Sequence, residues 1–127
     1  MIGYVTLGTN DADRARAFYD AVLGEVGIGR LMENETFVAW GTSMGAPSLA
    51  VTAPNDGNAA TAGNGTMVAI AVDANDKVDR VYNKAIEMGG TCEGPVGERM
   101  DGFYAGYFRD LDGNKLNVFC HSGGPLD

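Results

Sequence analysis

The stretch YVTLGTNDADRARAFYDAVL, residues 4–23, is followed 63 residues later by a stretch of the same pattern, MVAIAVDANDKVDRVYNKAI, residues 67–86. The two stretches align without a gap and agree in residue class more than in identity, as where Phe18-Tyr19 meets Val81-Tyr82. Agreement at a fixed offset is typical of one structural unit used twice. We therefore expect an internal repeat.

Each copy is predicted to begin with a strand and to continue with a helix. Apolar residues alternate at the start of each copy, which indicates a strand with one buried face. Asn10 or Asp73 then follows as the expected helix N-cap. Apolar residues at i, i+3, i+4 and i+7 form one stripe on each helix. These residues are Ala15, Phe18, Tyr19 and Val22 in the first copy, and Val78, Val81, Tyr82 and Ala85 in the second.

Three further strands are expected in each copy, because β-prone residues lie between turn signals. They are predicted at residues 28–33, 36–41, 48–52, 91–93, 103–109 and 115–120. The segment between the copies, residues 53–65, contains Pro54 and several Gly and Asn residues and is expected to be a loop. The prediction is one α+β domain over residues 1–127, built from two βαβββ modules at residues 1–53 and 65–121.

Strand alternation also sorts residues onto the two faces of each predicted sheet. Val5, Leu7, Leu49, Val51, Val68, Ile70, Leu116 and Val118 should face the helices. The other face receives Tyr4, Thr6, Ser48, Ala50, Met67, Ala69, Lys115, Asn117 and Phe119. If the sheets curl toward each other, this face lines a cleft, which is the default place for a ligand. The alternatives are that it packs against a second subunit or is solvated.

Composition excludes several classes of partner. The chain has 127 residues, 45% of them hydrophobic, and a net charge of −8. This charge disfavours nucleic acid and anionic membranes as partners. No apolar run is long enough to span a bilayer, and we expect no secretion signal. Two cysteines are too few for a disulfide framework. We expect a cytoplasmic protein.

Two segments of the sequence are distinctive. The first is VTLG, residues 5–8, followed by Asp11, Asp13, Arg14 and Phe18-Tyr19. The second is YFRDLDGNKL, residues 107–116. Together they resemble the vicinal oxygen chelate superfamily, the glyoxalase/bleomycin resistance protein/dioxygenase family. The resemblance implies tandem βαβββ modules that form a curled mixed-sheet cleft, as in glyoxalase, bleomycin resistance protein and dihydroxybiphenyl dioxygenase. It also implies a homodimer.

The resemblance further implies four metal-ligand positions, usually His, then His, Gln or Glu, then His, then Glu. In this chain they are occupied by Tyr4, Ala50, Met67 and Asn117. None supplies a carboxylate or an imidazole, and methionine suits soft metals. We therefore expect no metal and no cofactor, unless this mapping of positions is wrong. The DLDGN segment imitates the start of a calcium loop, but a tight hairpin turn is expected there instead.

The leading functional prediction is binding of a small molecule in the cleft without a metal. The expected cleft residues are Tyr4, Trp40, Met67, Arg99, Tyr107 and Asn117. Trp40 could equally be a core or dimer-interface residue. Arg109 and Lys115 could hold an anionic group or be solvated surface charges.

Two other functions stay open. One is a glyoxalase-like lyase or isomerase, related to lactoylglutathione lyase, with an altered or metal-free site. The other is a structural or regulatory dimer whose cleft is filled by its own side chains. The sequence assigns no catalytic residue. Bleomycin resistance proteins of this family are similar in lacking the metal and in taking a cationic drug into an acidic groove, with which the charge of −8 is compatible.

Overall fold

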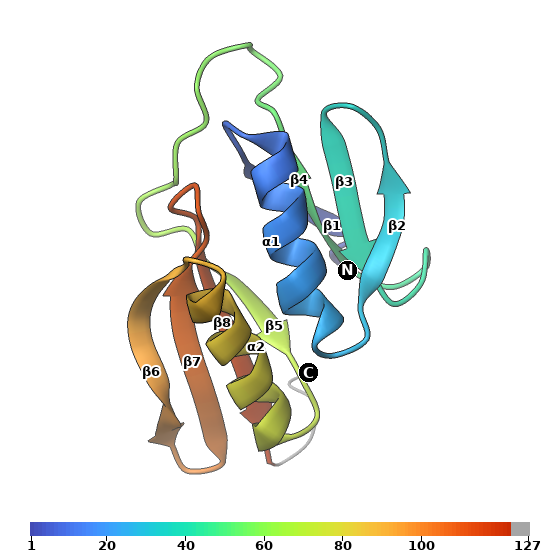
Figure 1. Cartoon of the computed structure of the whole chain (residues 1–127). Helices are drawn as coiled ribbons and strands as arrows, with labels where there is room; N and C mark the ends of the chain where they lie inside the picture. Colours follow the sequence, from blue (N-terminus) through green and yellow to red (C-terminus); the bar gives the residue numbers. More distant parts are fainter. Residues whose placement is uncertain (123–127) are drawn as a thin grey trace.

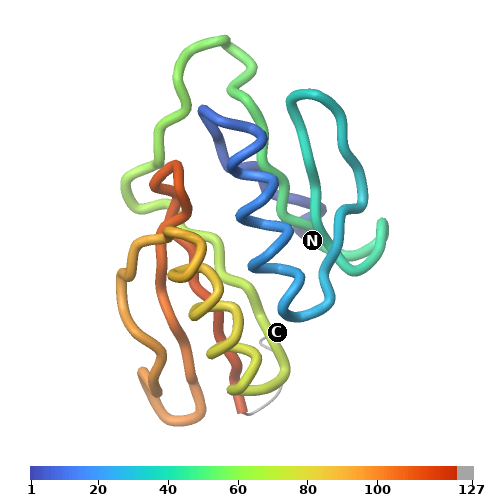
Figure 2. The backbone as a smooth tube through the Cα atoms, viewed as in Figure 1, coloured from blue at the N-terminus to red at the C-terminus, as the bar shows by residue number. Residues whose placement is uncertain are grey.

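The computed structural model describes residues 1–122, which form two βαβββ modules in tandem, as the repeat predicts (Figure 1). Module one contains β1 (Tyr4–Gly8), α1 (Ala12–Gly24), β2 (Gly29–Glu33), β3 (Phe37–Gly41) and β4 (Ser48–Thr52). Module two contains β5 (Val68–Ala71), α2 (Asn75–Glu87), β6 (Thr91–Met100), β7 (Phe103–Arg109) and β8 (Lys115–His121). The segment between β4 and β5 contains no strand or helix and passes along the outside of the molecule (Figure 2).

Each module has its own four-stranded mixed sheet. Sheet A has the strand order β1-β4-β3-β2, and sheet B has the order β5-β8-β7-β6. The pairs β1–β4 and β5–β8 are parallel, and the other neighbouring strands are antiparallel. No strand pairing joins the two sheets within residues 1–122, so they do not close on each other. The helices α1 and α2 lie side by side in front of both sheets (Figure 1).

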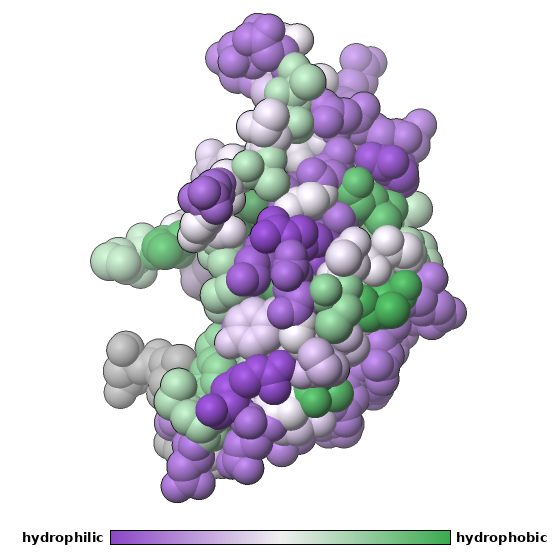
Figure 3. Space-filling view, turned by 90° about the vertical axis from the view of Figure 1, so that its left-hand side faces the viewer, coloured by the Kyte–Doolittle hydropathy of each residue, from purple (hydrophilic) through white to green (hydrophobic). Residues whose placement is uncertain are grey.

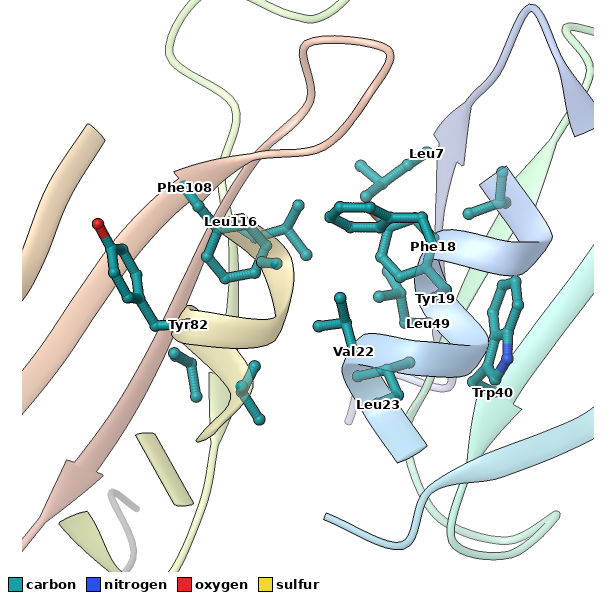
Figure 4. Packing of buried hydrophobic residues seen from close by; sticks show 14 of the residues in the cluster. Leu7, Phe18, Tyr19, Val22, Leu23, Trp40, Leu49, Tyr82, Phe108 and Leu116 are labelled. Atoms are coloured by element: carbon teal, nitrogen blue, oxygen red, sulfur yellow. The ribbon is translucent and has the colours of Figure 1, made fainter. Parts of the chain in front are cut away.

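The apolar stripes of the two helices meet in one core. All eight predicted stripe residues are buried. Phe18 and Val22 of α1 point toward Leu116 of β8, whereas Trp40 lies on the sheet A side of the helix (Figure 4). Of the residues predicted to face the helices, five are fully in the core, and Val5, Val68 and Ile70 pack against it. Because the buried cluster is continuous, the two modules are stabilised by the same apolar contacts.

A buried carboxylate in the β7–β8 turn joins the modules through hydrogen bonds. Oδ2 of Asp110 accepts from the Tyr19 hydroxyl of α1 at 2.6 Å and from the Asn114 amide at 2.9 Å. Oδ1 accepts from the backbone N–H groups of Asp112 and Asn114, each at 2.9 Å. The Asn114 amide also donates to the carbonyl of Gly8, at the end of β1. Residues 110–114 therefore form the predicted hairpin turn and attach it to module one.

Two local predictions were wrong. The N-caps are Asp11, whose side chain accepts from the N–H of Arg14, and Ala74, which makes no side-chain cap; neither is Asn10 or Asp73. Strand β6 is also much longer than the predicted 91–93, because antiparallel pairing with β7 continues through three register shifts. No helix within residues 1–122 has the length and apolar character needed to cross a membrane.

The bond between Tyr19 and Asp110 predicts an asymmetry between two tyrosine substitutions. Y19F removes a buried hydroxyl that donates to a carboxylate, and we expect it to lower the free energy of unfolding by about 2 kcal/mol. Y104F removes a bond of the same length, to Asp79, at a less buried place, and should cost about 0.5 kcal/mol. Urea unfolding of both variants measures the difference, and equal losses would contradict the special role of the buried bond.

The same bond predicts a dependence on pH. Burial, and then the Asp110 carboxylate, raise the pKa of Tyr19 well above its usual value. The stability is therefore fully present below about pH 10 and falls above it, because only the unfolded chain releases this proton. The stability of Y19F should fall less steeply above this pH than that of the unsubstituted chain.

Candidate functional site

The candidate site lies on the open faces, the sides of sheets A and B turned away from the helices. On sheet A, Tyr4 and Thr6 of β1 pair with Ser48 and Ala50 of β4. The ring of Phe37 on β3 meets the ring of Tyr4 edge to face, with 6.2 Å between centroids. Here the chain forms a mainly apolar pocket of about 260 Å³. Its lining residues are Gly3, Tyr4, Leu31, Met32, Phe37, Ala39, Met44, Ala46 and Ser48.

The open face of sheet B is more polar. Tyr107 of β7 pairs in register with Asn117 of β8, and Arg109 pairs with Lys115. The guanidinium of Arg99 lies 5.4 Å from the Tyr107 ring centre, and the ammonium of Lys115 lies 5.8 Å from it. Asn117 is buried, and its amide donates to the carbonyl of Gly106 at 3.3 Å. The structure thus brings Arg99, Tyr107 and Asn117 together, with Lys115 beside them.

An ion pair borders this group of side chains. Arg109 donates from Nε to the carboxylate of Glu93 on β6. This hydrogen bond and the charge of Arg109 hold the pKa of Glu93 below its usual range, and the charge of Lys115 adds to the effect. Seen from the side of β6, the surface is mostly hydrophilic, with smaller apolar patches (Figure 3).

Trp40 lies apart from Arg99, Tyr107 and Asn117 of sheet B, but it lines a cavity between the modules together with Met67. Only 1% of its surface is exposed, and its ring lies 5.4 Å from that of Tyr19 on the helix side of sheet A. The indole N–H donates to the carboxylate of Asp20 on α1 at 2.9 Å. The sequence leaves three alternatives open for Trp40: a cleft wall, a core residue or a dimer-interface residue. Its burial against α1 is that of a core residue.

The structure has a groove between the modules that the sequence does not locate, although Trp40 and Met67, two of the predicted cleft residues, lie in its wall. Two adjoining cavities of about 640 and 570 Å³ share Ile28, Thr42 and Ala71 in their walls. Their lining is largely apolar, and the charged pair in it, Asp73 and Lys77, is joined by an ion pair of 2.7 Å. No sequence pattern could have revealed this groove, because it depends on how the two modules pack.

Comparison with known proteins decides the family. Residues 1–118 match the sequence profile of the Glyoxalase/Bleomycin resistance protein/Dioxygenase superfamily. This chain belongs to that superfamily. A glyoxalase/bleomycin resistance protein from Albidiferax ferrireducens T118 shares 36% identity with it over 95% of this chain and 98% of that chain, with a TM-score of 0.88.

More distant members of the superfamily share the fold. A family enzyme from Burkholderia phytofirmans PsJN is 21% identical over 94% of this chain and 97% of that chain, with a TM-score of 0.75. A lactoylglutathione lyase from Agrobacterium tumefaciens is 20% identical over 99% of this chain and 97% of that chain, with a TM-score of 0.71. A comparison with curated proteins finds no match.

The four positions at which the superfamily is expected to hold a metal do not fit a divalent ion. Tyr4 has 61% of its surface exposed, and Ala50 presents only a buried methyl group. Met67 precedes β5 and offers a thioether, and Asn117 offers an uncharged amide. Hard and borderline divalent ions prefer carboxylate and imidazole ligands, and neither is present in this set. Residues 1–122 contain no group of three His, Cys, Asp or Glu placed to hold a metal ion.

The placement of Trp40 predicts its fluorescence behaviour. Because this tryptophan, the only one in the sequence, is buried beside Tyr19, acrylamide should quench its emission weakly in the native protein. In denaturant the quenching should approach that of free tryptophan. Strong quenching in the native state would place Trp40 on an open surface and contradict the core assignment.

Proposed function

We propose that this chain binds a small organic molecule against the open faces of its sheets, without a metal. The observation that carries the proposal is the donor set at Tyr4, Ala50, Met67 and Asn117, which lacks charge and imidazole. The exposed hydroxyl of Tyr4 and the thioether of Met67 can contact a ligand, but they polarise it weakly, and the Asn117 amide is buried and bonded to the backbone. The groove between the modules is a weaker candidate, because its charged residues Asp73 and Lys77 already pair with each other.

A second copy of the chain is proposed to enclose the ligand. The strand orders leave β1 and β5 at sheet edges, where each has one side without a strand partner among residues 1–122. Apolar side chains beside these edges are exposed, by 55% at Ile2, 61% at Tyr4 and 42% at Met67. Free edges and exposed apolar groups favour association with another chain. The free thiols of Cys92 and Cys120 suit a reducing, cytoplasmic location.

The lyase and the purely structural alternatives are separated from this proposal by experiment. At 20% identity, the likeness to the A. tumefaciens lactoylglutathione lyase supports the fold and carries no activity to this chain. Turnover of lactoylglutathione that survives EDTA would support a metal-free lyase. A dimer that binds no small molecule would support the structural alternative.

The donor set predicts the metal content. Protein purified without an affinity tag and then offered Mn²⁺, Fe²⁺, Ni²⁺ and Zn²⁺ should retain far less than one equivalent of any of them after gel filtration. Elemental mass spectrometry makes the measurement. One tightly held metal per chain would overturn the proposal and restore the lyase or dioxygenase alternative.

The proposed assembly predicts a dimer of twice the 13.3 kDa chain mass in light scattering. M67K puts a charge beside the free edge of β5 and should weaken the dimer at least tenfold. M100K changes a methionine that is 66% exposed at the far end of β6, and it serves as the matched control with an unchanged dimer. A monomeric parent protein, or equal weakening by both variants, would refute this arrangement.

A further inference from the structure

Cations without a carboxylate partner are few in this acidic chain. The sequence has nine Lys and Arg residues, and five of them form ion pairs within the described structure. The other four are Arg16, Arg80, Arg99 and Lys115. Two of these four, Arg99 and Lys115, lie over the same ring, that of Tyr107 on the open face of sheet B.

Backbone features of β6 hold Arg99 in this place. Its guanidinium donates to the carbonyl of Pro95, four residues earlier in the same strand. Gly94 and Gly97 leave the room that it occupies, because a Cβ at either position would come within 3.3 and 3.0 Å of its nitrogens. The Tyr107 ring supplies the other contact, a cation–π interaction. Arg99 is therefore oriented by its surroundings, although it is exposed to solvent.

The charges around Lys115 leave this end of the face positive. Arg109 is its register partner on β7, and Glu93 is the acid whose pKa responds to both cations. Glu93 is already bound by Arg109.

The other acids of this region have partners too: Glu98 accepts a hydrogen bond from the N–H of Gly102, and Asp112 pairs with Arg14. The Asp110 carboxylate is buried and accepts four hydrogen bonds from Tyr19 and its own turn. An anion placed between Arg99 and Lys115 would meet attraction from both.

The opposite end of the same face is apolar. Along β8 from Lys115, the next residues on this face are Asn117 and then Phe119. Phe119 pairs with Ala105 and stacks on Phe103, with ring centres 5.1 Å apart. The four residue steps from Lys115 to Phe119 span about 13 Å. The face thus changes from cationic to aromatic over the length of a medium-sized organic molecule.

We propose that the ligand is an organic carboxylate with an apolar body, its carboxylate between Arg99 and Lys115 and its body extended over the Tyr107 ring toward the half-buried ring of Phe103. This inference rests on the proposed function and names the ligand class of that site. The net charge of −8 is compatible with a cationic ligand, but the end of the open face that carries Arg99 and Lys115 is positive and favours an anion. A cationic drug would be repelled where the open face is most polar.

Three probes that share a six-carbon chain ending in a phenyl ring, and that carry a negative, a neutral or a positive end group, test the proposal. They are 6-phenylhexanoate, 6-phenylhexanamide and 6-phenylhexylamine, each titrated into the full chain by calorimetry at low and high salt. The carboxylate should bind at least tenfold more tightly than the amide, and the amine most weakly. High salt should reduce the advantage of the carboxylate, because it screens the two cations.

Charge-matched variants identify the cations. R99Q and K115Q should each weaken 6-phenylhexanoate about tenfold and leave 6-phenylhexanamide unchanged. R80Q removes an equally unpaired cation from α2, so it makes the same change in net charge and should alter neither affinity by more than twofold. Thermal melting of each variant checks that the fold is kept.

The outcomes separate this inference from the proposed function. Equal or tighter binding of the amide or the amine, or equal weakening by R80Q, would overturn the carboxylate and leave small-molecule binding in place. Binding of none of the three probes at millimolar concentration would count against both. A tightly held metal together with carboxylate binding dependent on Arg99 and Lys115 would overturn only the metal-free function.

Discussion

The relative position of the two modules depends on the Asp110 carboxylate. It is buried and accepts four hydrogen bonds, from Tyr19, the backbone of Asp112, and the backbone and side chain of Asn114. Two of the donor residues lie on its own turn and one on α1 of the other module. The same carboxylate therefore closes the turn and joins it to module one. A buried charge is tolerated when its hydrogen bonds are complete, and removing one partner leaves a large desolvation penalty. We infer that this turn determines how the shared core is assembled.

The same turn places the candidate site. Residues 110–114 connect β7 to β8, so they determine the register in which Arg109 meets Lys115 and Tyr107 meets Asn117. A salt bridge from Arg14 to Asp112 adds a further link between α1 and the turn. A motif that fixes the module interface therefore also aligns the cationic end of the open face. Stability and ligand recognition depend on the same short segment, and changes at Asp110 should disturb both.

Features set by periodicity and residue class could be predicted from the sequence, whereas features set by strand pairing could not. Helix stripes and strand alternation correctly assigned the core because each depends on local spacing. Asn10 was a plausible N-cap, but its side chain instead binds the backbone of Ala60, a contact invisible along the chain. The FVAW run of residues 37–40 has no polar alternation, so the face of Trp40 could not be read directly, although its pairing with Leu49 places it on the helix side. Arg99 reaches Tyr107 only through the register shifts of β6, which no alternation pattern in that strand reveals.

Intermolecular NOEs in the complex with 6-phenylhexanoate test the central claim, ligand binding on the open face, most directly. We expect contacts from the phenyl protons to Phe103, which does not line the groove, and from the methylene protons to Tyr107. Contacts to Ile28 and Thr42 would place the ligand in the groove between the modules and would contradict binding on the open face.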